Sequence, residues 1–177
     1  MKKQRSVIYK KISHALFGER LALDLDNEFY QVVEGLVVNH KTMNDYEAFK
    51  LGLIVQFGLD SKISLEQFTS AKENELIELV YQETIGHYEY RKKEMMQNSI
   101  PVFKNIRLQQ GNHIENVIVP VSDGKTAFNV LVNLDKNIAT SGSALAVQSE
   151  RSIALSLVDD AWKEHLRAMD DLKQSVQ

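Results

Sequence analysis

Two side chains stand at a spacing that suits a metal ion. Glu83 and His87 lie four residues apart in a stretch of helical periodicity, so both would face the same side of one helix. Zinc and di-iron sites need further ligands, commonly from HExxH or Glu-x-x-His motifs, and the chain has neither. The other histidines are scattered. A helix-surface pair is therefore expected, and a small metal-dependent hydrolase built on Glu83 and His87 is the weakest alternative.

A phosphate-binding loop is the next candidate. Gly124-Lys125-Thr126 matches the end of a Walker A motif, in which a glycine stands five positions before the last glycine. Val119 occupies that earlier position, and the surrounding pattern is that of a hairpin. The sequence therefore predicts a turn at Gly124 and no nucleotide site.

Catalytic carboxylates and nucleophiles complete the search. Two groups of carboxylates could act as general acids or bases only if they lay in apolar surroundings: Asp24 with Asp26, and Asp159 and Asp160 with Glu164. Each group is more simply explained as part of a solvated helix face. No Gly-x-Ser-x-Gly elbow occurs. The sequence therefore predicts no catalytic, cofactor-binding or metal-binding residue, and by itself the chain is not expected to be an enzyme.

Composition limits the class of protein. The 177 residues are 44% hydrophobic and 25% charged, which is typical of a chain that folds in water. No apolar run approaches the roughly 20 residues of a membrane helix, and no signal-peptide core follows the basic start. The absence of cysteine fits a cytoplasmic protein. A net charge of -3 makes nucleic acid an unexpected partner.

Most of the chain must lie in long helices, because it has only two prolines and eight glycines. Apolar residues spaced by three, four or seven predict a first helix to about Val38, followed by a polar loop over 39–45. A short helix over 46–57, a loop over 59–63 and a capping box at Ser64 then precede a long helix from about Ala71. This helix is expected to be interrupted at Pro101.

A β-hairpin follows, because residues 117–121 and 128–134 have strand-like composition and are joined by Asp123-Gly124. Pro120 marks an edge strand, and two strands alone must lean on a helix. Ser141-Gly142-Ser143 is expected to be a flexible joint before a last helix. The fold class predicted is mainly α, with long amphipathic helices and one inserted hairpin.

Both ends of the chain lie in helical patterns that lack capping residues. We therefore expect a piece of a longer protein. The alternative is a free-standing helical adaptor whose hairpin adds as a strand to a partner. Exposed apolar stripes would also allow a homodimer.

Two runs of residues carry a resemblance to a known family. Near the end stand Trp162-Lys163-Glu164-His165-Leu166, then Met169-Asp170 and Leu172, and near the start stand Gln4-Arg5, Ile8-Tyr9 and His14-Ala15-Leu16. In this order they resemble the helical scaffold of SecA preprotein translocase ATPases. The resemblance implies four segments: a first scaffold helix over 1–38, a helical wing over 39–113, an inserted hairpin over 114–136, and a scaffold over 137–177 that continues into the first arm of a two-helix finger.

The resemblance also implies a place in a motor. Such a parent binds ATP and magnesium in nucleotide-binding domains of the same chain, works with the Sec membrane channel and a preprotein, and lies peripherally on the cytoplasmic face of the membrane. The stretch itself holds no cofactor and would transmit motion. The apolar stripes of the first and last helices predict six residues that anchor the packing against other domains: Tyr9, Leu16, Leu23, Trp162, Leu166 and Met169.

Overall fold

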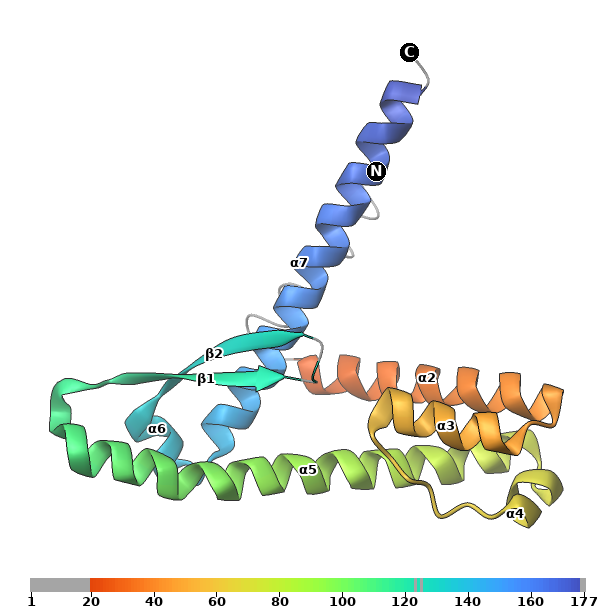
Figure 1. Ribbon diagram of the computed structural model, residues 1–177, viewed down its shortest axis with the longest axis horizontal. Coiled ribbons are helices and arrows are strands. Elements are labelled where there is room, and N and C mark those ends of the chain that lie inside the picture. Colours follow the sequence, from red (N-terminus) through yellow and green to blue (C-terminus); the bar gives the residue numbers. More distant parts are fainter. Residues whose placement is uncertain (1–19, 123, 125, 176–177) are drawn as a thin grey trace. The chain divides into compact units, whose positions relative to one another are not determined.

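The computed structural model describes residues 20–122, 124 and 126–175, with only the backbone given for 170 and 172–175. Within these residues the chain is mainly helical with one antiparallel hairpin, which confirms the predicted fold class (Figure 1). The elements are α2 (Leu21–Met43), α3 (Tyr46–Phe57), α4 (Leu65–Ser70), α5 (Glu73–Gln110), the 3-10 turn η1 (Gly111–His113), β1 (Asn116–Ser122), β2 (Ala127–Asn133), α6 (Leu134–Ala139) and α7 (Ser143–Ser175).

The chain divides into two compact units. The first, here called the helical unit, is Leu23–Glu94, and the second, the hairpin unit, is Met95–Gln177 together with Met1–Ala22. Helix α5 contributes residues to both. The four segments expected from the sequence stay predictions.

The helical unit is built on α2, α3, α4 and the first part of α5. Local signals set its short helices: the Asp45 side chain accepts a hydrogen bond from the Ala48 amide, 2.9 Å away, and Gly58 ends α3 at φ +63°. Ser64 and Gln67 form the predicted capping box of α4. The core is aromatic and aliphatic, with the Phe49 and Phe68 rings 4.9 Å apart, and contains Val33, Val37, Phe49, Leu53, Ile63, Phe68, Leu76, Ile77 and Val80.

Helix α2 runs further than predicted, through residues 39–43, where the sequence predicted a loop. Polar residues do not end a helix when its last carbonyls find partners. Asn44 adopts a left-handed φ of +53°, and the Asp45 amide donates to the His40 carbonyl at 3.0 Å. The Lys41 ammonium donates to the carbonyls of Phe68, at 3.0 Å, and Ala71, so this last turn is also tied to the end of α4.

The expected interruption at Pro101 is also wrong, because α5 continues to Gln110. Proline at this position removes the hydrogen bond to the carbonyl of Gln97. Both residues are exposed, so water can solvate that carbonyl and the helix persists.

The hairpin unit packs its sheet on helices, as two strands require. Strands β1 and β2 pair antiparallel, with Val119 opposite Val130, and Gly124 takes φ +88° in the predicted turn. The inner face of β2 lies against α7 and α6. The core of this unit contains Phe103, Val130, Val132, Leu134 and Leu145.

Pro120 lies at the outward edge of β1. The Leu134 amide donates to the Glu115 carbonyl at 2.9 Å, so these two residues form a hydrogen-bonded pair. Along antiparallel strands, hydrogen-bonded and non-hydrogen-bonded pairs alternate. Residues 116, 118, 120 and 122 therefore turn their backbone groups away from β2. Because Pro120 has no N–H, this edge of β1 cannot accept a full added strand.

Candidate interdomain surface

The proposed metal pair does not form a metal site. Both carboxylate oxygens of Glu83 accept hydrogen bonds, Oε2 from the Ser61 hydroxyl at 2.6 Å and Oε1 from the Lys62 amide at 2.7 Å. Among residues 20–122, 124 and 126–175, no group of three or more potential ligands could hold a metal ion. Glu83 therefore secures the loop over 59–63 to α5.

We predict that Glu83→Ala lowers the free energy of unfolding by about 1–3 kcal/mol, because the buried Ser61 hydroxyl and the Lys62 amide lose their acceptor. Urea titration followed by circular dichroism measures this change. Glu78→Ala is the control, since the exposed Glu78 carboxylate accepts a hydrogen bond from Gln82 one turn further along the same helix, and it should change stability by less than about 0.5 kcal/mol. A rise in melting temperature on adding zinc would contradict this assignment.

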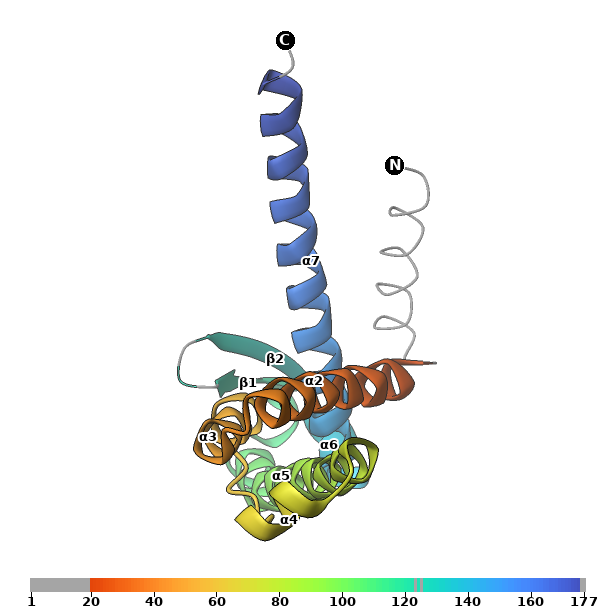
Figure 2. The ribbon, with the colours of Figure 1, turned by 90° about the vertical axis from the view of Figure 1, so that its right-hand side faces the viewer.

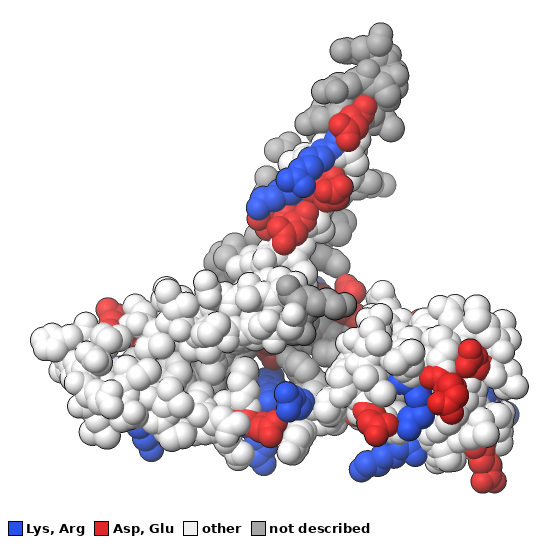
Figure 3. Space-filling model, in the orientation of Figure 1, with Lys and Arg blue, Asp and Glu red and all other residues white. Residues whose placement is uncertain are grey.

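The candidate catalytic carboxylates bond to neighbouring groups. Asp26 accepts a hydrogen bond from the Tyr81 hydroxyl, and this bond, with burial, raises the pKa of Tyr81 to about 12. On α7, Asp159 pairs with Lys163 and raises the pKa of that ammonium. Acidic and basic side chains alternate along this part of α7 (Figure 3). Four of the five candidates are exposed, as the sequence predicted, and Asp24 is half-buried; the exposed ones are Asp26, Asp159, Asp160 and Glu164.

The expected packing anchors lie partly within the described residues. Tyr9 and Leu16 lie outside them, and Leu23 of the helical unit is 61% exposed. The other three are on α7: Trp162 and Met169 are half-buried, and Leu166 is 42% exposed. Their packing against other domains stays a prediction.

Helix α7 has an anchored beginning and a projecting end. Its first turns pack under β2, whereas its later part extends beyond β1, β2 and α6 (Figures 1 and 2). One face of the projecting part is apolar and half-buried, and the Trp162 ring stacks on His165 with ring centroids 5.6 Å apart. The half-buried apolar residues of this face are Leu155, Val158, Trp162 and Met169.

Helix α3 carries a second exposed apolar surface. Phe49 and Leu53 bury one side of it in the helical unit. On the other side, Leu51, Ile54 and Val55 are 60%, 47% and 68% exposed. Large apolar side chains that are exposed together on one face of a helix are typical of an interaction surface. This face therefore suits a contact with another domain.

Sequence reasoning missed the junction between α5 and α7. Asn137 on α6 is fully buried, and its Nδ2 donates to the Ser99 hydroxyl of α5 at 3.2 Å. Its Oδ1 accepts from the Leu145 amide of α7 at 2.9 Å. Asn137 follows the charged pair Asp135-Lys136 and precedes Ile138, and this local pattern does not reveal its burial.

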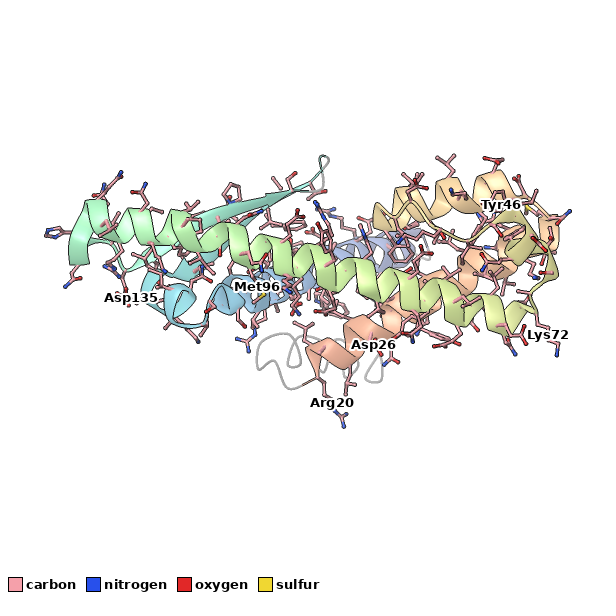
Figure 4. The ribbon with its side chains drawn as sticks, turned by 90° about the horizontal axis from the view of Figure 1, so that it is seen from below. Arg20, Asp26, Tyr46, Lys72, Met96 and Asp135 are labelled. Carbon is pink, nitrogen blue, oxygen red and sulfur yellow. The ribbon has the colours of Figure 1, made fainter. Side chains whose placement is uncertain are left out.

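Gly142 is a tightly packed turn, and the expected flexible joint at 141–143 is wrong. Its φ is +86°, and a Cβ atom there would lie 2.5 Å from the Met96 carbonyl oxygen and 2.8 Å from the Met96 Cα. Figure 4 labels Met96 where α7 passes α5. The start of α7 therefore touches the backbone of α5, which only glycine permits.

Comparisons with known proteins agree on one family. The model of the SecA Wing and Scaffold domain matches residues 1–177. The SecA subunits of the protein translocases of Christiangramia forsetii, Cytophaga hutchinsonii and Parabacteroides distasonis are 39%, 40% and 38% identical over 177 residues. All of this chain is covered, and it spans 16% of the length of each relative. No solved structure matches. None of the helices, over the described residues, is long and apolar enough to cross a membrane.

Proposed function

Since the chain belongs to the SecA Wing and Scaffold domain family, we propose that it is the non-catalytic scaffold and wing of an ATP-driven protein translocase. In this role it transmits conformational change between the nucleotide-binding domains of its parent chain and the elements that move a preprotein through the Sec channel. ATP and magnesium would be bound by those other domains. The parent would lie peripherally on the cytoplasmic face of the membrane.

The projecting face of α7 carries this proposal. Trp162 and Leu166 are large apolar side chains that remain partly exposed on a helix whose first turns are fixed in the hairpin unit. Aromatic anchors of this kind dominate the energy of interfaces. A helix fixed at one end and gripped along its other part moves as a rigid element, which suits transmission. The exposed face of α3 offers a second place for a neighbouring domain.

We predict that the double change Trp162→Ala and Leu166→Ala in the full-length parent lowers ATP-driven preprotein import into inverted membrane vesicles by about tenfold or more, because an interdomain anchor is lost. Nucleotide binding should be retained, since neither side chain is proposed to contact the nucleotide. Import of a labelled preprotein, measured by protease protection, tests this.

The matched control changes the charged face of the same turns. Lys163→Ala with Glu164→Ala removes exposed side chains and should leave import within about twofold of the unchanged protein. Equal import by the anchor variant and the control, at equal protein concentration, would refute the proposed function.

A further inference from the structure

Helix α7 begins without a capping side chain of its own. Gly142 precedes its first residue and has no side-chain oxygen, so the first amides of α7 need acceptors from elsewhere. The Thr140 hydroxyl accepts from the Ala144 amide at 3.0 Å, and Asn137 Oδ1 accepts from the Leu145 amide at 2.9 Å. The start of α7 is therefore capped by residues in α6 and in the turn that follows it.

The same asparagine also reaches α5. While its oxygen caps α7, its Nδ2 donates to the Ser99 hydroxyl, which in turn donates to the Met96 carbonyl at 2.7 Å. A carboxamide supplies both the acceptor and the donor that this relay needs. Because Asn137 and Ser99 are buried, water cannot easily replace either bond.

A second attachment lies beside the first. Gly142 packs on the backbone of Met96, and its own amide donates to the Asn137 carbonyl at 2.8 Å. Leu145, one turn into α7, lies in the same apolar cluster as Phe103 of α5. Hydrogen bonds, backbone contact and apolar packing therefore join α7 to residues 95–110 of α5 at neighbouring points, which opposes both tilting and sliding.

We propose that Asn137 is a positioning residue that locks the start of α7 to this part of α5, so that the two helices move as one body. This inference rests on the proposed function, and it names the contact through which α7 receives displacement. A rigid coupling transmits a movement in full, whereas a loose one absorbs it.

The experiment measures the coupling directly in the full-length parent. Spin labels are attached at Lys104→Cys on α5 and Asp160→Cys on α7, both exposed, in a background without other reactive cysteines. With Asn137 intact, pulsed electron paramagnetic resonance should give one narrow distance distribution. Asn137→Ala should broaden it and lower the amount of preprotein imported per ATP hydrolysed by about fivefold, with ATP turnover retained.

Two further variants separate coupling from stability. Asn133→Ala removes the asparagine four residues earlier, whose side chain caps α6 by accepting from the Lys136 amide, and it should leave the distribution narrow and import per ATP unchanged. Ser99→Ala keeps the Asn137 cap on α7 but breaks the link to α5, so it should broaden the distribution as Asn137→Ala does. If Asn137→Ala does not fold, the distance distribution and the import per ATP of the Ser99→Ala variant test the proposal.

Two results would overturn the inference. One is a narrow distribution in the Ser99 and Asn137 variants, and the other is a broadened distribution with unchanged import per ATP. Full import by the Trp162 and Leu166 double variant refutes the proposed function instead. A defective double variant together with fully coupled junction variants refutes only the positioning role of Asn137.

Discussion

Replacing Gly142 with alanine is expected to lower the free energy of unfolding by about 2–5 kcal/mol. A left-handed φ of +86° costs a non-glycine residue roughly 1–2 kcal/mol. The added Cβ would also lie 2.5 to 2.9 Å from three backbone atoms of Met96, which cannot rotate aside as a side chain would. Forced overpacking of this kind costs a further 1–3 kcal/mol or so. Urea unfolding of the 177-residue chain, followed by circular dichroism, measures the sum.

Gly124 provides a matched control for this change. Its φ of +88° is nearly the same, but a Cβ there meets no atom within 4 Å. Gly124→Ala should therefore show the conformational cost alone, about 1–2 kcal/mol. Equal destabilisation by the two variants would mean that α7 does not touch the α5 backbone at Gly142.

Replacing Phe49 with alanine is expected to cost about 3–5 kcal/mol, because the ring is fully buried and leaves a cavity. The lost contacts include the Phe68 ring at 4.9 Å and the Tyr46 ring at 6.5 Å between centroids. Thermal unfolding monitored by near-ultraviolet circular dichroism should show the lower midpoint and a loss of aromatic signal.

Leu51, two residues along α3, is the control for Phe49. It is 60% exposed, so Leu51→Ala removes little buried surface and should change stability by less than about 0.5 kcal/mol. A similar loss in both variants would contradict the assignment of the buried and exposed faces of α3.

The sequence predicted those elements whose signals are local. Asp45, Gly58, Ser64 and Gln67 act within one helix turn, so their pattern is sufficient to place α3 and the start of α4. The end of α4 at Ser70 was not predicted. The hairpin was predictable for the same reason, since Gly124 and the alternation around it define a turn and two strands.

Elements that depend on distant partners were not predictable. The end of α2 is held by Lys41, whose acceptors Phe68 and Ala71 lie 27 and 30 residues away. The partner of Glu83, the Ser61 hydroxyl, is 22 residues distant. The roles of Asn137 and Gly142 depend on α5, about 40 residues earlier in the chain, and no periodicity records such a contact. The candidate anchors on α7 came from helical spacing and the resemblance, and they stay predictions.

Pro101 gives α5 a mechanical weak point. A helix turn that lacks one hydrogen bond has lower bending stiffness than its neighbours, and proline is the usual place where long helices bend. Met96 and Ser99, the residues to which Gly142 and Asn137 attach, lie in the turns immediately before it. The start of α7 is therefore attached to α5 beside the turns where α5 bends most easily. A force that bends α5 there would act on two joined helices, which resist bending more than α5 alone.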